Sequence, residues 1–335
     1  MIKLWTNLIN RISNKKYLAA VSGGPDSMAM LNMYKRNIRV VCHVNYHKRE
    51  SSDRDQQIVV DFCKKNNLII EILNVDEKVY ERYGHIDNFQ AKARLIRYDF
   101  FKEIGKKYNI ENLYTAHNFD DFLETAYMQR ARQSKALFYG IRESNVINGI
   151  IVKRPVLFVR KQTLQRYCDE NKIKYGIDET NELDIYERNR VRKIISSWSS
   201  NEVYDFKKFV IKYNKEHSSF ANFIDLSYIE FKKNKYKYDY FIRQDDMVQY
   251  YLIYYFLIDH KIINPSENKI ISLIKFFGKQ INKEKAYRVQ ENIYMHVNDD
   301  DLISLISYNK NNNISNSNVD IIDDFNVIEK QVDNN

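Results

Sequence analysis

The hexapeptide from Ser22 to Ser27 combines residue types that are suited to binding phosphate. It reads Ser22-Gly23-Gly24-Pro25-Asp26-Ser27 and follows the apolar run 17–21, in a chain with only eight glycines and three prolines. We expect a strand to end at Val21, the paired glycines to turn the backbone tightly, and Pro25 to open a helix. The first turn of such a helix offers free amide N–H groups at the positive end of the helix dipole. With the two serine hydroxyls, these donors predict a pocket for phosphate or pyrophosphate.

This turn also has a purely structural interpretation, because strand-to-helix loops often contain glycine for backbone reasons alone. The hexapeptide lacks the lysine of a Walker A loop, and neither G-x-x-x-x-G-K-[ST] nor G-x-G-x-x-G occurs in the sequence. These absences argue against transfer of a γ-phosphate and against dinucleotide binding.

The stretch from Thr115 to Thr125 places acidic residues at helical spacing. If a helix begins after Asn118, Asp121 and Glu124 share its exposed face, opposite an apolar face. The same residues have a structural interpretation. Asn118 is a good N-cap, Asp121 occupies the third helical position as in a capping box, and acidic residues in the first turn complement the helix dipole. The sequence leaves both interpretations open here.

The elements around these motifs alternate between strand and helix with short connections. Apolar, strand-like runs occur at 38–44, 68–75 and 113–116, and predicted helices at 53–67, 88–108 and from 119 onward. This order predicts an α/β fold with a doubly wound, mostly parallel sheet, in which ligands bind at the carboxyl ends of the strands. The hexapeptide, His43 and His117 all fall at that edge.

The composition changes after about residue 200. We expect residues 1–200 to form the α/β domain that carries the candidate site, beginning with a short amphipathic helix at 1–14. Residues 201–308 predict a smaller, mainly helical domain. Residues 309–335 are polar and acidic and predict a disordered tail.

The overall composition limits the class of protein. The 335 residues include 53 Lys and Arg against 44 Asp and Glu, a formal charge of +9, which favours a polyanionic partner without requiring one. Since no stretch approaches the roughly 20 apolar residues of a membrane span, we expect no membrane association and a cytoplasmic location. Cys42, Cys63 and Cys168 are far apart, which indicates neither a zinc site nor a disulfide framework and fits a reducing compartment.

Four motifs stand in the order found in a known family. The hexapeptide resembles the pyrophosphate loop of the N-type ATP pyrophosphatases, which split ATP between its α and β phosphates. Residues 115–125 resemble the T-A-H-x-x-D-D-x-x-E-T signature of the tRNA(Ile)-lysidine synthetases, with Asn118 where members usually have a second histidine. Residues 93–100 resemble their A-R-x-x-R-Y-x-F helix, and residues 178–192 their E-D-x-[ST]-N…Y-x-R-N-R-[IV]-R block. The resemblance implies an adenine nucleotide alpha hydrolase-like fold.

The arginines of two motifs are candidates for contacts with phosphate. Arg94 and Arg97 project from one side of a predicted helix; such a pair usually faces solvent, but beside an ATP loop one of them can offset charge in the transition state of adenylyl transfer. In the last motif, Arg188 and Arg192 align on one helical face and Arg190 points elsewhere. We therefore expect divided roles, with some arginines contacting RNA phosphate and others the active site.

The resemblance implies an ATP-dependent carbon–nitrogen ligase that acts on the wobble cytidine, position 34, of a tRNA(Ile) with a CAU anticodon. The C2 carbonyl oxygen of this base attacks the α-phosphate of ATP, and pyrophosphate leaves. The ε-amine of free L-lysine then displaces AMP from C2 and gives lysidine. The same resemblance implies Mg²⁺ on the phosphates and a tRNA-binding role for residues 201–308, and it leaves the oligomeric state open.

Site residues follow from the matching motif positions. Those expected to bind ATP are Ser22, Gly23, Gly24, Pro25, Asp26, Ser27, His43 and His117, with Asp26 also the candidate for Mg²⁺. Those expected to act in catalysis are Asp26, Arg97, Asp121 and Glu124. Those expected to contact lysine or tRNA are Asp121, Glu124, Arg188, Arg190 and Arg192. Free lysine has a side-chain pKa of about 10.4, so the nucleophile must be bound and then lose a proton, and a pair of carboxylates suits both steps.

Two alternatives stay open at the level of the sequence. The first is a tRNA thiolase of the same superfamily, which adenylates a base carbonyl but delivers sulfur and usually needs a reactive cysteine. The three cysteines here lie within predicted strands and helices, where cysteine is most often a small buried hydrophobe. The second is a non-catalytic RNA-binding protein with a vestigial nucleotide fold, against which the intact hexapeptide and acidic pair argue.

Overall fold

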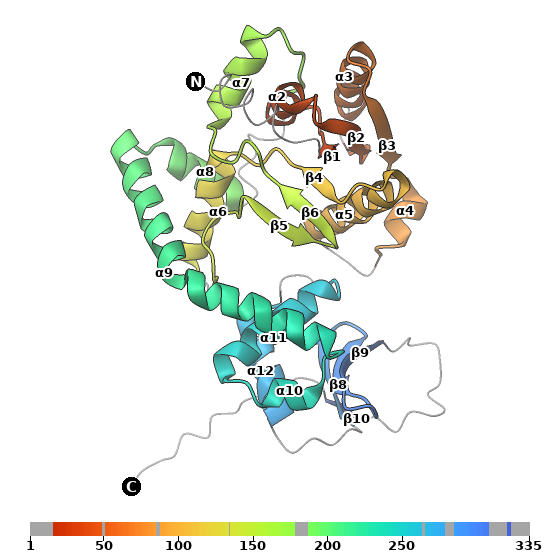
Figure 1. The fold of residues 1–335 in the computed structure, drawn as a ribbon, viewed down its shortest axis with the longest axis vertical. Helices are drawn as coiled ribbons and strands as arrows, with labels where there is room; N and C mark the ends of the chain where they lie inside the picture. The colour runs from red at the N-terminus through yellow and green to blue at the C-terminus, as the bar shows by residue number, and fades with distance from the viewer. Residues whose placement is uncertain are drawn as a thin grey trace. The chain divides into compact units, whose positions relative to one another are not determined.

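The computed structural model describes residues 16–48, 51–84, 88–133, 135–177, 187–262, 265–278, 285–307 and 320–322. The chain divides into two compact units, one ending at Ser218 and the other beginning at Ser219. Figure 1 shows the α/β architecture of the first unit. Among the described residues, none of the helices is both long and apolar enough to span a bilayer.

A mostly parallel sheet forms the centre of the first unit. Its strands are β1 (Tyr17–Ala20), β2 (Ile38–Asn45), β3 (Ile69–Asn74), β4 (Asn112–Tyr114), β5 (Ser144–Ile147) and β6 (Ile150–Lys153). Within the described part of the chain the strand order is β3-β2-β1-β4-β6-β5, and β5 alone pairs antiparallel, with β6. The order changes direction between β1 and β4, which is the point where a doubly wound sheet leaves a crevice for a ligand. The predicted fold class is confirmed.

Helices pack on both faces of this sheet (Figure 1). The helices that belong wholly or partly to the first unit are α2 (Pro25–Tyr34), α3 (Ser52–Lys65), α4 (Glu77–Glu81), α5 (Phe89–Tyr108), α6 (Phe119–Ala131), α7 (Lys161–Glu170), α8 (Glu187–Ser196) and α9 (Ser200–Lys233). Successive residues of β1 point to opposite faces: Ala19 packs in a core cluster with α2, α3 and α7, and Leu18 in a cluster with α5. Because both faces are buried, β1 is apolar throughout rather than alternating.

A third apolar cluster fixes helix α6. Phe119, Phe122, Leu123 and Ala126 face this cluster, as the helical periodicity predicts, and they pack with residues of α8 and α9 such as Val191. The cluster holds the first turn of α6 at the carboxyl edge of β4. It therefore sets the position of the acidic residues on the same helix.

The second unit combines helices with a small sheet. Besides the end of α9 it contains α10 (Tyr238–Ile242), α11 (Asp246–Asp259), α12 (Glu267–Gly278), β7 (Lys285–Gln290), β8 (Ile293–Val297), β9 (Ile303–Ser307) and β10 (Asp320–Ile322). Among the described residues the four strands pair in the order β10-β7-β8-β9. The helices agree with the predicted helical region, but the sheet was not predicted. Its strands are three to six residues long and do not keep a regular alternation of polar and apolar residues, which gives a weak strand signal.

The predicted domain boundary and the two predicted terminal segments can be compared with these elements. The boundary proposed at residue 200 coincides with the start of α9, whereas the compact units divide after Ser218, inside that helix. The helix predicted at residues 1–14 lies outside the described residues. So does the predicted disordered tail, except for β10, which pairs with β7.

Removing the Leu123 side chain should destabilise the first unit. Leu123 is fully buried in the α6 cluster, and Leu→Ala changes at such sites cost about 2 to 5 kcal/mol through lost burial and the cavity left behind. The free energy of unfolding of Leu123→Ala can be measured by urea titration followed by circular dichroism. The control is Ile211→Ala, where the side chain is 54% exposed and the expected change is within about 0.5 kcal/mol. Equal losses in the two variants would contradict the role assigned to this cluster.

Candidate active site

The hexapeptide links β1 to α2 through a tight turn that only glycine can make. Gly23 has a φ of +92°, and a Cβ atom on it would lie 2.8 Å from the carbonyl oxygen of Asp55. Both the left-handed backbone and the close approach therefore require glycine at this position. The carbonyl oxygen of Gly23 also accepts a hydrogen bond from the N–H of Gly176 at 2.9 Å, which ties the turn to the segment after α7.

The serines of the hexapeptide hold the turn in shape. Ser27 Oγ donates to the carbonyl oxygen of Gly24 at 2.9 Å, and the N–H of Ser22 donates to Ser27 Oγ at 3.2 Å. Helix α2 then begins at Pro25, with Gly24 as its N-cap. Because glycine has no side chain to satisfy the first amide groups of the helix, these donors stay available for an anion.

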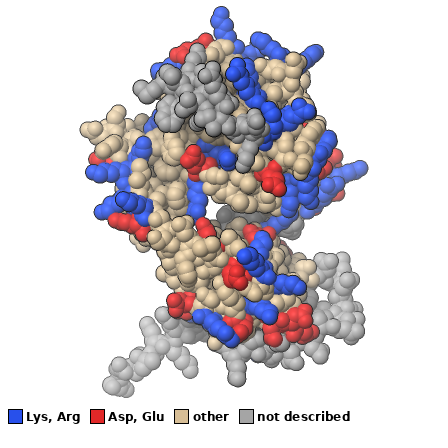
Figure 2. All heavy atoms as spheres, in the orientation of Figure 1, with Lys and Arg blue, Asp and Glu red and all other residues tan. Residues whose placement is uncertain are grey.

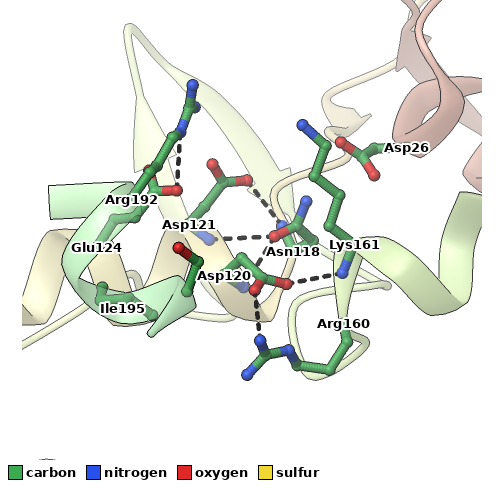
Figure 3. A pocket seen from close by; sticks show the side chains of 10 residues that line it. Asp26, Asn118, Asp120, Asp121, Glu124, Arg160, Lys161, Arg192 and Ile195 are labelled. Atoms are coloured by element: carbon green, nitrogen blue, oxygen red, sulfur yellow. Dashed lines mark hydrogen bonds and ion pairs between the residues drawn. The ribbon is translucent and has the colours of Figure 1, made fainter. Parts of the chain in front are cut away.

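Asp26 lies in the first turn of α2 and carries a carboxylate that is poorly satisfied. Its Oδ1 is buried and has no hydrogen-bond partner among the described residues. Burial raises the pKa of Asp26 to about 6, the charge of Lys161 lowers it, and the charges of Asp121 and Asp120 raise it further. Figure 3 shows the four residues around one pocket. A group of this kind has unused capacity to bind a cation.

The start of α6 is a complete capping box. The side-chain oxygen of Asn118 accepts hydrogen bonds from the N–H groups of Asp120 and Asp121 at 2.9 and 3.1 Å, and Asp121 Oδ2 accepts one from the N–H of Asn118 at 3.0 Å. The structural interpretation of these residues is therefore confirmed. It also gives Asn118, which stands where the family usually has histidine, a definite role as N-cap.

Helix α8 brings two arginines onto the acidic pair. Arg188 Nε donates to Glu124 Oε2 at 2.7 Å, Arg192 Nε donates to Glu124 Oε1 at 2.9 Å, and an Arg188 Nη donates to Asp121 Oδ1 at 3.1 Å. The alignment of Arg188 with Arg192 is as predicted, and Arg190 is exposed. The prediction that Glu124 lies on an exposed face was wrong: it is 4% exposed, because α8 covers that side of α6.

Two adjoining cavities open at the carboxyl edge of the sheet. The larger, about 810 Å³, is bounded by the hexapeptide, the ends of β1 and β2, and α5; the smaller, about 250 Å³, lies at the first turns of α6 and α7 and against α8 (Figure 3). Asp26, Asp121 and Arg192 line both. The two cavities therefore form one connected site.

Most of the predicted site residues meet there. Those that line the larger cavity are Ser22, Gly24, Asp26, Ser27, His43, Arg97, His117, Asp121, Arg188 and Arg192, and Glu124 lines the smaller one. Gly23 and Pro25 shape the hexapeptide without lining either of these cavities. Arg190 lines neither, so the structure does not bring it to the acidic pair.

Both predicted histidines are neutral hydrogen-bonding groups at pH 7. His43 Nδ1 lies 2.8 Å from the carbonyl oxygen of Val21, and His117 Nδ1 lies 3.0 Å from Thr115 Oγ1. Burial lowers the pKa of His43, and burial lowers the pKa of His117 to about 4. They can orient a ligand through hydrogen bonds but do not supply positive charge.

Several residues of the site were not predicted. Tyr46, Lys48 and Phe89 line the larger cavity, and Arg160 and Lys161 the smaller. The first two follow β2 directly, so the rule that ligands bind at strand ends could have found them. The last two open α7, and only the packing of α7 beside α2 and α6 brings them to the site; the sequence carries no local signal for this.

The buried His43 should make the protein sensitive to acid. Because its pKa in the folded state lies below its ordinary value of 6.5, the unfolded state takes up a proton first and stability falls as the pH drops below about 6.5. His43→Gln should therefore lose less stability than the unchanged protein between pH 7 and pH 5, as measured by urea titration at both values. The matched control is His47→Gln on an exposed side chain. An unchanged pH dependence in His43→Gln would contradict the assignment.

Comparison with known proteins agrees with this geometry. A family model described as a PP-loop domain matches residues 2–197. A curated tRNA(Ile)-lysidine synthase of Ureaplasma parvum serovar 3 (strain ATCC 700970) is 97% identical over 330 residues, covering 98% of this chain and 99% of that protein. The tRNA(Ile)-lysidine synthase of Malacoplasma penetrans (strain HF-2) is 40% identical over 286 residues, covering 84% of this chain and 96% of that protein.

A solved structure supports the fold. A U34-tRNA thiolase, NcsA from Methanococcus maripaludis with its [4Fe-4S] cluster, superposes with a TM-score of 0.53 at 15% identity, covering 65% of this chain and 80% of that one. At this identity the likeness concerns the architecture alone. The sequence matches are closer and extend over nearly the whole chain. The chain therefore belongs to the PP-loop family and, within it, to the tRNA(Ile)-lysidine synthases, which use ATP to modify tRNA.

Proposed function

We propose that this enzyme converts the wobble cytidine of a CAU-anticodon tRNA(Ile) to lysidine, with free L-lysine as the amine and Mg²⁺ on the phosphates of ATP. The observation that carries the proposal is the shared wall of the two cavities. Asp26 of the phosphate loop and Asp121 of the acidic pair both line this wall. An activated base in the larger cavity can therefore meet an amine held in the smaller one.

The larger cavity suits ATP and the target base together. Ser22 and Ser27, with the first amides of α2, are placed to bind phosphate, and Arg97 lines the same cavity. When the C2 oxygen of cytosine attacks the α-phosphate, negative charge grows on the phosphoryl oxygens and on the departing pyrophosphate. A guanidinium on the cavity wall stabilises this charge in the transition state.

The acidic pair has two separate tasks in this proposal. Both oxygens of Glu124 accept from arginines and its side chain is 5% exposed, so it is suited to holding Arg188 and Arg192 in place. The side chain of Asp121 is 21% exposed, lines both cavities and has its Oδ1 3.1 Å from an Arg188 Nη. We therefore assign to Asp121 the contact with the lysine ε-ammonium and the removal of the proton that frees its lone pair. The amine then forms the C–N bond at C2 as the C–O bond to AMP breaks.

Asp26 fits the role of a Mg²⁺ ligand. A buried carboxylate oxygen with no partner among the described residues, next to a phosphate site, is the kind of oxygen ligand that Mg²⁺ takes. Within the described chain no group of three or more His, Cys, Asp or Glu side chains is arranged to hold a metal. The residues thus suit a Mg²⁺ ion that is held mainly by the phosphate oxygens of ATP and by one carboxylate, that of Asp26. When bound, such an ion would offset the negative charge of the phosphates.

The positive charge of the surface suits the RNA substrate. The chain carries a formal charge of +9, and in the view of Figure 2 lysines and arginines form several groups on the first unit and outnumber the acidic residues there. Such a surface binds the phosphate backbone with little regard to sequence, while the target base must leave its stack and enter the cavity. The exposed Arg190 is our candidate for a backbone contact.

The sulfur-transfer alternative finds no support in the cysteines. All three are buried, and burial raises the pKa of Cys63 and of Cys168 to about 12, so neither thiol is readily deprotonated to a thiolate.

The test that separates the proposed reaction from its alternatives is pyrophosphate release from ATP. Repeated turnover should require both lysine and tRNA(Ile) with the CAU anticodon, because without lysine each enzyme-bound base can be adenylated only once and AMP is not displaced. Sustained pyrophosphate release with tRNA but without lysine would overturn the proposal.

Asp121→Asn should abolish lysidine formation and leave tRNA binding nearly intact. The amide keeps an oxygen for the capping box but cannot take a proton, and loss of a general base typically lowers turnover by about 10²- to 10⁴-fold. Turnover with radiolabelled lysine and tRNA affinity by filter binding give the two readouts. Asp205→Asn, an exposed aspartate on α9, is the matched control and should keep full activity. Undiminished turnover in Asp121→Asn would remove the assignment.

Arg190→Gln should weaken tRNA binding and leave the KM for ATP unchanged. If Arg190 contacts a phosphate, its loss removes about one released counterion, so the slope of log Kd against log salt should fall by about one. The measurement is tRNA affinity across a salt series. An unaltered slope would show that Arg190 does not contact the backbone.

A further inference from the structure

The phosphate loop lacks a positive charge of its own. A nucleoside triphosphate brings several negative charges to the start of α2, and the hexapeptide offers hydroxyls and amides but also the carboxylate of Asp26. A Walker-type loop meets this difficulty with an internal lysine, which is absent here. A cation must therefore come from another element of the fold.

Two of the three cations that line the smaller cavity with Asp26 are engaged in ion pairs. Arg192 binds Glu124, and Arg160 pairs with Asp120 at 2.9 Å. Lys161 is different: among the described residues, no carboxylate lies within ion-pair distance of its ammonium. Its charge acts on Asp26 without forming an ion pair and is available to a ligand.

A hydrogen bond of its backbone N–H fixes the position of Lys161. Its N–H donates to Asp120 Oδ2 at 2.7 Å, and the other oxygen of Asp120 binds Arg160, so the first turn of α7 is held against the first turn of α6. From this anchor the side chain extends toward the first turn of α2. Figure 3 shows its ammonium beside the carboxylate of Asp26 and away from Glu124 and Arg192.

We propose that Lys161 supplies the missing cation and binds the β- and γ-phosphates of ATP, then the pyrophosphate that they become. This inference rests on the proposed function and extends it by naming a phosphate-binding residue outside the four motifs. When the bond between the α-phosphorus and its bridging oxygen breaks, the electron pair stays on pyrophosphate. The ammonium stabilises this charge without giving up a proton.

The direction of the side chain decides between two anionic ligands. A lysine on the wall of the smaller cavity could also bind the carboxylate of the amino-acid substrate. That role requires the ammonium to face the space beside Asp121 and Glu124, whereas it lies at Asp26, on the phosphate side of the site. The geometry therefore favours a polyphosphate.

The test measures binding of pyrophosphate and of AMP, each with Mg²⁺, to the full chain by calorimetry without tRNA or lysine. Lys161→Gln should bind pyrophosphate at least about tenfold more weakly, while its affinity for AMP stays within about twofold, because a single charge-assisted contact is lost. Retained AMP binding also shows that the variant is folded. Lys161→Arg, which keeps the charge, should restore most of the affinity for pyrophosphate. Lys64→Gln, at the exposed end of α3, is the matched control.

Two results would overturn the inference. Unchanged pyrophosphate affinity in Lys161→Gln would remove the phosphate contact. A raised KM for lysine in turnover, with pyrophosphate affinity unchanged, would assign the ammonium to the substrate carboxylate instead. Since the binding measurements use neither tRNA nor lysine, they test Lys161 separately from the proposed reaction.

Discussion

The ion-pair cluster of Glu124 with Arg188 and Arg192 is the interaction on which the site depends. A carboxylate that is 4% exposed is tolerated because a guanidinium donates to each of its oxygens. The cluster joins α6 to α8, which are separated in the sequence by the loop, hairpin and α7 between them. Without it, α8 would still be held to α6 by apolar contacts and by the Arg188–Asp121 contact, but Arg192 would lose its partner at Glu124 on the cavity wall.

The acidic and the basic side chains of the site come from different helices. The carboxylates Asp26, Asp120 and Asp121 stand in the first turns of α2 and α6, where the helix dipoles favour negative charge. The cations come from α5, α7 and α8, which approach from other sides. Substrates that carry phosphate and ammonium groups can therefore find opposite charges within one cleft, while each protein charge stays stabilised by its own surroundings.

Local spacing predicted much of this arrangement, and long-range packing supplied the rest. The turn at Gly23, the capping box of Asn118 and the alignment of Arg188 with Arg192 depend on residues within a few positions of each other. The burial of Glu124 depends on α8 covering α6, and the position of Lys161 depends on α7 lying beside α2. The local periodicity of apolar residues in the sequence does not indicate such contacts between helices. The short strands of the second unit were missed because they alternate too weakly to be distinguished from loop.

The structural role of Asp121 is compatible with the chemical role that we propose for it. Its Oδ2 accepts from the N–H of Asn118 and closes the capping box, while its Oδ1 lies toward Arg188. Because the cap fixes one oxygen, the side chain has little freedom and the other oxygen is held in a defined place. A general base gains from such restriction, since proton transfer needs donor and acceptor in a narrow range of geometry. Asp121, at the third position of α6, is for this reason well suited to accept the proton of the lysine ammonium in the proposed reaction.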